Sequence, residues 1–260
     1  KDAKVNSDIL TYLKPDDPAV ILFNRIGEQY AGTSLAMMGI KAEDVFEYNT
    51  LLTINSLTEQ FSQIPGVASV MSLTDVLDIR SVEGGLEVGR LIDKNEIPSN
   101  PDTLQKIKAY ALSKDMYRGN LVSDDGKITV IIARLKEDAD KIAIGRQMKE
   151  IVEETRGGEK SYYGGIPFQM VFLTEMIQSD LVRLIPLVIL LVMGILFMSF
   201  RSLRGVFLPL SCVLMSTVWV LGIMSLLKIP LTIASDAIPV LLVAVGSAYG
   251  IHMLSKYNED

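Results

Sequence analysis

The sequence has little of the chemistry on which disulfides, metal sites and nucleotide sites depend. It contains one cysteine, Cys212, and one histidine, His252, in 260 residues. A single cysteine excludes an internal disulfide, and one histidine without a compact set of further ligands argues against a metal site. There is no glycine-rich loop ending in Lys-Ser/Thr, so ATP-driven pumping by this chain is not expected. We therefore expect no metal and no cofactor.

Clustered basic residues are also missing. Residues 1–180 carry 20 Lys and Arg against 28 Asp and Glu, a net charge of −8, whereas residues 181–260 carry five basic and three acidic residues. Nucleic-acid binding needs concentrated positive charge, so we expect no nucleic-acid partner. The chain begins with Lys1, without an initiator methionine or a signal peptide, and we interpret it as a piece of a longer protein.

What the sequence does contain is long apolar runs in its last third. Three stretches, at about 181–200, 206–227 and 231–254, have the length and composition of membrane-spanning helices, because a bilayer core requires roughly 20 apolar residues per helix. We therefore predict a transmembrane region over residues 167–260. It follows an acidic folded domain over residues 1–166.

Basic residues in the short connections predict the orientation. Arg201 and Arg204 lie between the first two spans and Lys256 follows the third, whereas the opposite side offers Arg183 and Lys228. Short cytoplasmic loops are enriched in Lys and Arg, so this three-to-two bias favours an extracytoplasmic folded domain. The sequence thus predicts a membrane protein with several spans.

The folded domain shows alternating helix and strand patterns. Apolar spacing, proline starts and glycine stops predict two βαβ-type units around an irregular insertion at about 74–126, hence an α+β domain with a ferredoxin-like split βαβ. The predicted helices lie at about 17–30, 43–63, 100–112 and 139–156, and the strands at about 33–40, 67–73, 120–123, 127–135 and 160–163. A helix from Pro167 is expected to continue unbroken into the first span.

Several short motifs together resemble one family. They are Ile64-Pro65-Gly66-Val67, the turn Ser123-Asp124-Asp125-Gly126-Lys127, Gly164-Gly165-Ile166-Pro167, Phe200-Arg201-Ser202-Leu203-Arg204-Gly205, and Gly246-Ser247-Ala248-Tyr249-Gly250-Ile251-His252 followed by Lys256-Tyr257. In this order the chain resembles the resistance-nodulation-division (RND) transporter superfamily. It is most similar to the MmpL branch of hydrophobe exporters, which is related to sterol-sensing-domain proteins.

The resemblance implies a fold and a function. The domain would be a periplasmic porter-type domain, and the spans would be helices two to four of a multi-pass transporter in the bacterial cytoplasmic (inner) membrane. The function would be efflux or shuttling of a hydrophobic or amphiphilic, lipid-like substrate, driven by an ion gradient such as the proton motive force. The implied partners are membrane lipid, the rest of the transporter or a second subunit, and a periplasmic accessory protein. No nucleophile–base pair is visible, so we do not expect an enzyme.

One departure from the family keeps an alternative open. Ala248 stands where many relatives place an acidic residue before the tyrosine, so the usual proton-carrying carboxylate is absent at this position. The alternative is a non-transporting membrane scaffold or lipid sensor that keeps the fold without proton coupling.

Polar residues within the third apolar stretch are the candidates for coupling, because hydrocarbon penalises polar groups that have no function or partner. For each of them a plainer role stays open: an interfacial group for Asp236 and His252, an interhelical hydrogen bond for Tyr249, and a bond back to its own helix for Ser247. Gly246 and Gly250 form a Gly-x-x-x-Gly pair that predicts close helix packing.

Overall fold

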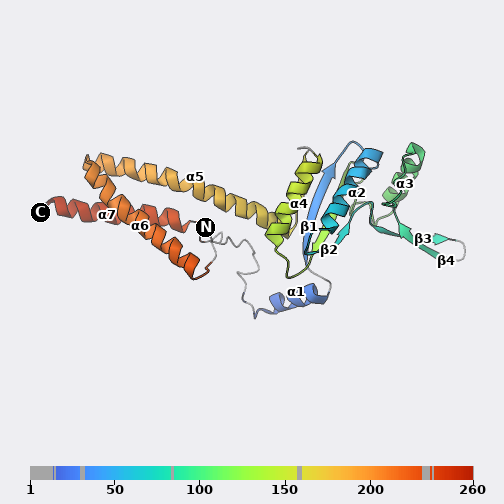
Figure 1. Ribbon diagram of the computed structural model, residues 1–260, viewed down its shortest axis with the longest axis horizontal. Coiled ribbons are helices and arrows are strands. Elements are labelled where there is room, and N and C mark those ends of the chain that lie inside the picture. The colour runs from blue at the N-terminus through green and yellow to red at the C-terminus, as the bar shows by residue number, and fades with distance from the viewer. Residues whose placement is uncertain are drawn as a thin grey trace. The chain divides into compact units, whose positions relative to one another are not determined.

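The structure is a computed structural model in which the chain forms two compact units (Figure 1). It describes residues 14–259 except 15, 30–32, 83–84, 157–159, 230–234 and 236. Contacts divide the described chain within one long helix, so that the first unit ends at Val171 and the second begins at Phe172. Each unit is considered by itself.

The first unit is a mixed α/β domain, as the sequence predicts. Its main sheet has the strand order β2-β5-β1-β6, and every neighbouring pair is antiparallel. Helix α2 connects β1 to β2 and helix α4 connects β5 to β6, which is a split βαβ connectivity. The elements are α1 (Pro18–Gln29), β1 (Ser34–Lys41), α2 (Tyr48–Ser62), β2 (Val67–Met71), β3 (Leu77–Val82), β4 (Gly85–Arg90), α3 (Pro101–Ser113), β5 (Ile128–Leu135), α4 (Lys141–Arg156) and β6 (Ser161–Gly164).

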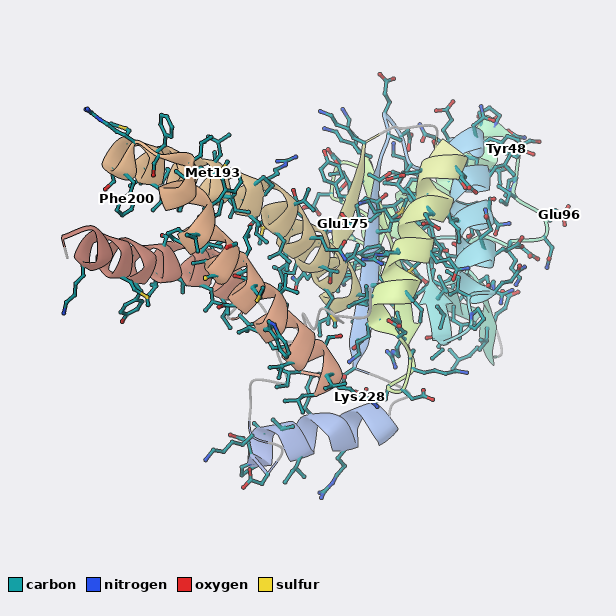
Figure 2. All side chains as sticks on the ribbon, turned by 60° about the vertical axis from the view of Figure 1, so that its left-hand side comes forward. Tyr48, Glu96, Glu175, Met193, Phe200 and Lys228 are labelled. Carbon is teal, nitrogen blue, oxygen red and sulfur yellow. The ribbon has the colours of Figure 1, made fainter. Side chains whose placement is uncertain are left out.

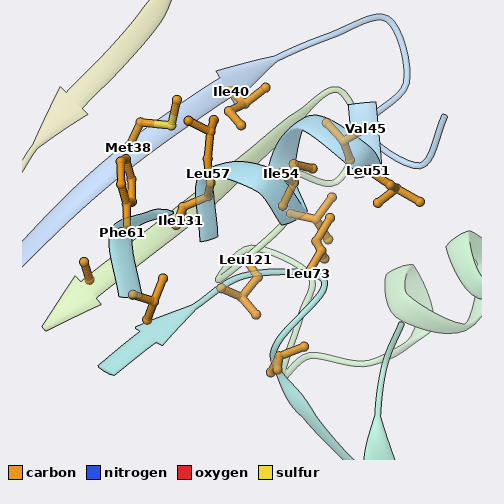
Figure 3. Close-up of a cluster of buried hydrophobic side chains, with 14 of the residues drawn as sticks. Met38, Ile40, Val45, Leu51, Ile54, Leu57, Phe61, Leu73, Leu121 and Ile131 are labelled. Carbon is orange, nitrogen blue, oxygen red and sulfur yellow. The ribbon is translucent and has the colours of Figure 1, made fainter. Parts of the chain in front are cut away.

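The core lies on one face of this sheet. Alternate residues of the two central strands are buried, among them Met38 and Ile40 of β1 and Ile131 of β5, because successive side chains of a strand point to opposite faces. These side chains meet Leu57 and Phe61, which lie on one stripe of α2 (Figure 3). Burial of each large aliphatic side chain stabilises the fold by about 1.5–3 kcal/mol.

Helix α2 begins later than its apolar pattern predicts, at Tyr48 instead of Glu43. The carboxylate of Asp44 accepts the backbone N–H of Phe46 at 2.9 Å, and the N–H of Val45 donates to the carbonyl of Gly126 at 3.0 Å. These bonds hold the segment in a turn, since a local side-chain acceptor competes with the helical hydrogen-bond pattern.

The prediction of irregular chain at about 74–126 is wrong for residues 77–82 and 85–90. Strands β3 and β4 pair antiparallel over six residues each and form a separate two-stranded sheet, which we call the β3–β4 ribbon (Figure 1). In the same region the predicted strand at 120–123 is reduced to isolated bridges of Val122, one to Arg118 and one to Thr129. The paired glycines at 84–85 suggested irregular chain, but Gly85 is the first residue of β4, and Gly84 lies outside the described residues.

The second unit consists of α5 (Ile166–Phe200), α6 (Leu203–Leu226) and α7 (Ile238–Glu259). By length and composition, α5 and residues 205–226 of α6 are able to cross a membrane. In Figure 2, Phe200 lies at the end of α5, where the chain turns into α6, and Lys228 follows the other end of α6. Helix α5 is unbroken over 35 residues, as predicted, and it includes Pro186.

The helix at the third predicted span begins later in the structure than the sequence predicts. Helix α7 begins at Ile238, whereas the apolar pattern begins at about Leu231, and its apolar part, Ile238–Gly250, is shorter than the other two among the described residues. Residues 230–234 lie outside the described part of the chain. The length of a third span therefore stays a prediction.

Gly165, between β6 and α5, gives the first test of the fold. Its φ is 89°, and a Cβ at this position would lie 1.9 Å from the carbonyl oxygen of Leu35. A Gly165→Ala variant combines a left-handed backbone with a collision against backbone, so we expect the free energy of unfolding to fall by about 3 kcal/mol or more.

The matched control is Gly89→Ala in β4, where no heavy atom lies within 4 Å of an added Cβ. Urea unfolding in detergent, followed by circular dichroism, measures both variants. Equal stabilities of the two would contradict the close approach at Gly165.

Candidate functional site

The turn between α5 and α6 explains the arginine-containing motif at residues 200–205. Ser202 caps α6, because its Oγ accepts the backbone N–H of Gly205 at 3.1 Å. Arg201 has a left-handed φ of 47°, and a Cβ at Gly205 would lie 2.6 Å from the Cβ of Phe200. The motif residues thus form a tight turn between α5 and α6. Position 205 requires glycine because the side chain of Phe200 occupies the space of a Cβ.

Helices α6 and α7 pack closely at the Gly-x-x-x-Gly pair. A Cβ at Gly246 would lie 2.8 Å from Cγ2 of Val213, and one at Gly250 would lie 2.6 Å from the Cβ of Pro209. Small residues permit such close backbone approach between apolar helices, where van der Waals contact replaces the hydrophobic effect as the driving force. Val243, one turn earlier, is also buried in this helix contact.

The candidate coupling residues occupy different environments. Ser247 is buried, and its Oγ donates to the carbonyl oxygen of Ala244 in its own helix at 2.8 Å. Tyr249 is 73% exposed, on another face of α7. Asp236 and the side chain of His252 lie outside the described part of the chain. The structure therefore separates Ser247 from Tyr249, and the roles of all four residues stay predictions.

An apolar cavity of about 960 Å³ lies along the α6–α7 pair. Leu208, Cys212 and Ser216 line it from α6, and Val245 and Tyr249 line it from α7. The hydroxyl of Ser216 donates to the carbonyl of Cys212 at 2.9 Å, so it adds little polarity to the wall. An apolar wall with one exposed tyrosine is suited to aliphatic chains of lipid or to apolar side chains of another helix.

The sequence analysis missed a polar cluster in the α/β unit. The buried carboxylate of Asp78 accepts hydrogen bonds from the hydroxyls of Tyr117 at 2.7 Å and Tyr110 at 3.0 Å, and from Nε of Arg80. The guanidinium carbon of Arg80 lies 4.9 Å from the centroid of the Tyr110 ring. The cluster ties β3 to α3 and to the turn after it.

The electrostatics of this cluster favour a fixed charge. Burial raises the pKa of Asp78, but the hydrogen bonds from Tyr117, Arg80 and Tyr110 and the charge of Arg80 outweigh it, and the pKa lies below its usual value. Burial and the neighbouring carboxylate raise the pKa of Tyr117. Around neutral pH, Asp78 therefore stays ionised and Tyr117 stays protonated. This indicates that the cluster anchors the ribbon and is not a proton-transfer site.

Metal binding finds no support in the arrangement of these groups. Within the described ranges, no group of three or more His, Cys, Asp or Glu side chains is placed to hold a metal ion.

The one sequence signal for the Asp78 cluster was an acidic residue inside a short apolar run. Its tyrosine partners lie 32 and 39 residues further along the chain, so spacing alone did not connect them.

An α/β domain followed by two apolar helices of membrane-spanning length defines a membrane protein with a folded domain. Comparison with known proteins gives the family: residues 16–260 match the MMPL family, and the chain belongs to it. A protein of Methanocaldococcus jannaschii whose name describes it as a membrane protein, MJ1562, is 25% identical over 264 residues. That alignment covers 95% of this chain and 64% of the relative. The chain thus spans less than two thirds of the length of that relative.

The close contact at Gly250 predicts a clear effect of one methyl group. In a Gly250→Ala variant the new Cβ collides with Pro209, so we expect the α6–α7 contact to loosen and the free energy of unfolding to fall by about 1–3 kcal/mol. Gly222→Ala in α6 is the control, because nothing lies within 4 Å of its added Cβ. Detergent-based unfolding measures both, and equal destabilisation would contradict tight packing at Gly250.

The Asp78 cluster predicts a pH-dependent loss of stability. An Asp78→Asn variant removes the acceptor charge from two tyrosines and an arginine, so we expect about 2–4 kcal/mol of destabilisation at neutral pH. The folded pKa is lowered, so the contribution of Asp78 is present above its usual pKa of 3.8 and is lost as pH falls through the folded value. The difference between wild type and variant should therefore shrink in acid.

The control for this experiment is Asp115→Asn, since the Asp115 side chain is 94% exposed and makes only a surface pair with Arg118. We expect its effect to stay below about 1 kcal/mol at every pH, as for exposed ion pairs in general. Urea unfolding at pH 3 to 8 measures all three proteins. A pH-independent loss in Asp78→Asn would remove the ionised carboxylate as the cause.

Proposed function

We propose that this protein is part of an RND-type secondary transporter of the cytoplasmic membrane that exports or shuttles a hydrophobic or amphiphilic, lipid-like molecule. The observation that carries the proposal is membership of the MMPL family over residues 16–260. The α/β unit takes the part of an extracytoplasmic porter-type domain, and α5, α6 and α7 take the part of membrane spans. The remaining spans belong to the rest of the transporter or to a second subunit.

The apolar cavity on α6 and α7 supports a hydrophobic substrate. Its walls are almost entirely aliphatic, and Tyr249 contributes one hydroxyl to them. The orientation follows from the basic residues: Arg201 at the α5–α6 turn faces the cytoplasm, and the α/β unit lies on the opposite side. A periplasmic accessory protein and membrane lipid are the partners that this arrangement suggests.

Coupling to a proton gradient requires side chains that can take up and release a proton. Ala248 supplies no carboxylate, and it is exposed next to Tyr249 on α7. The candidate groups are Tyr249, His252 and Asp236, since each can donate or accept a proton. Ser247 is a weaker candidate because its hydroxyl already donates within α7.

Transport in proteoliposomes tests the proposal. The full-length protein is reconstituted with an imposed pH gradient, and transfer of a fluorescent phospholipid analogue between leaflets or vesicles is recorded. We expect transfer that requires the gradient and stops with an uncoupler. A Tyr249→Phe variant, which keeps the ring and loses the hydroxyl, should transfer at least about tenfold more slowly if that hydroxyl carries a proton.

Two further variants sharpen the assignment. Met253→Leu is the control, because Met253 is 79% exposed one turn beyond Tyr249 in the same cavity wall and carries no exchangeable proton. His252→Ala should slow transfer if His252 belongs to the coupling path, and an unchanged rate removes it. Transfer that proceeds equally without a gradient would contradict a coupled transporter.

A membrane scaffold or lipid sensor is the second candidate function, and Ala248 is the observation that favours it. Such a protein would retain a specific lipid without moving it against a gradient. Native mass spectrometry of the full-length protein in its own membrane patches distinguishes binding from its absence, and the vesicle assay then separates sensing from transport. Retained lipid with gradient-independent exchange would favour the sensor.

A further inference from the structure

A polar cavity of about 600 Å³ lies within the α/β unit, and none of its lining residues belongs to the Asp78 cluster. It is formed where β1 ends, beside the first turns of α2, whose first residue Tyr48 is labelled in Figure 2. Residues at the end of α4 and the start of β6 complete its wall. The volume lies in the range of roughly 300–1,000 Å³ that small-molecule sites occupy.

The cavity is rich in hydrogen-bond donors, and none of its described lining residues is Asp or Glu. The polar side chains that can donate into it include Lys41, Lys160, Asn49, Thr50 and Tyr162. The rest of the domain has the opposite character, because residues 1–180 contain more Asp and Glu than Lys and Arg. A cavity that gathers two ammonium groups without a carboxylate is suited to an anion.

The register of the sheet brings these two lysines to the same place. Ile40 of β1 pairs with Ser161 of β6, and Lys41 and Lys160 are the next residues beyond that pair on the two segments. Like charges at facing positions of antiparallel strands are destabilising. An anion held by both ammonium groups replaces this repulsion with attraction.

Several polar side chains of the cavity are available to a ligand. The hydroxyl of Thr53 donates to a carbonyl of its own helix at 3.0 Å, and the hydroxyl of Thr155 does so at 2.7 Å. Four other lining side chains form no hydrogen bond or ion pair within the described chain, namely Lys41, Asn49, Thr50 and Tyr162. Ligand oxygens are therefore able to bind these donors without displacing a protein partner.

We propose that this cavity binds a phosphate ester, either a small soluble molecule or the headgroup of a phospholipid. Lysine ammonium groups bind phosphate oxygens as point charges, and Asn49 and Thr50 supply further donors. The volume leaves room for an organic group beside the phosphate, and Tyr162 offers that group an aromatic surface. The proposal concerns binding alone and holds whether or not the protein transports a substrate.

Isothermal titration calorimetry of the full-length protein in a neutral detergent tests the site. The probe is glycerol 3-phosphate, and glycerol is its uncharged match. We expect glycerol 3-phosphate to bind with half-saturation below ~1 mM and glycerol not to bind, because the phosphate carries the interaction with the lysines.

A lysine variant connects the binding to this cavity. Lys41→Met keeps the length of the side chain and removes its charge, so we expect at least about fivefold weaker binding of glycerol 3-phosphate. Lys160→Met, on the other side of the cavity, should weaken binding in the same way. The matched control is Lys106→Met, because Lys106 is an exposed lysine of α3 that does not line the cavity.

The affinity of the control variant should equal that of the wild type. All three lysines are exposed, so the unfolding midpoints of the variants should stay unchanged, and circular dichroism checks that each variant is folded.

Competition distinguishes the two sources of the phosphate. Dihexanoyl phosphatidic acid and, as its uncharged match, dihexanoyl glycerol are added before the titration with glycerol 3-phosphate. Displacement by the phosphatidic acid alone supports the site and assigns it to a phospholipid headgroup. Binding of glycerol 3-phosphate that neither lipid displaces supports the site and assigns it to a soluble ester.

Four outcomes would overturn the proposal. They are half-saturation above ~10 mM, which is adventitious binding of an ion, binding of glycerol as tight as that of its phosphate, unchanged affinity in Lys41→Met, and an equal loss in Lys106→Met. None of them bears on transport, because calorimetry needs no gradient and the vesicle assay measures transfer independently.

Discussion

Close approach at positions without a side chain is the constraint on which both units depend. Gly165 lies against the carbonyl of Leu35 where the sheet passes into α5, and Gly205 lies against Phe200 where α5 turns into α6. Gly250 lies against Pro209 where α7 meets α6. At each point a methyl group would collide with atoms that cannot move freely, so the sequence is restricted there by sterics and not by chemistry.

The same constraint gives the family motifs a physical meaning. The segments at 164–167, 200–205 and 246–252 each contain one of these glycines. A motif that is typical of a transporter family therefore also contains residues that are there for close packing. The match to the MMPL family therefore gives the family, whereas a motif by itself does not assign a role to Tyr249 or His252.

The sequence predicted the elements whose signals are local. Strand β1 was predicted from an apolar run and β5 from the hairpin turn before it, and α5 and α6 were predicted from the lengths of their apolar stretches. The β3–β4 ribbon was missed because its strands are short and because the paired glycines in the sequence, Gly84 and Gly85, suggested irregular chain. The Asp78 cluster was missed because it depends on Tyr110 and Tyr117, whose proximity arises only when α3 folds back onto β3.

The polar groups of α6 and α7 divide into two kinds. Thr217 and Ser247 are buried, and each donates to a carbonyl of its own helix, so they cost little in an apolar environment. Tyr249 is different, because its ring is exposed and lines the cavity. Hydroxyl groups that are satisfied within a helix cannot relay protons without breaking that bond. This leaves Tyr249 as the other described polar side chain of the apolar part of α7, Ile238–Gly250.

Ala248 bears directly on energy coupling. A carboxylate at the centre of a spanning helix costs about 2.5–3.5 kcal/mol on insertion scales, and proteins that keep one recover this cost through function. Here the helix avoids the cost at position 248. A gradient-driven protein would then need titratable groups elsewhere, and in the sequence Asp236 precedes and His252 follows the closely packed Gly246–Gly250 segment.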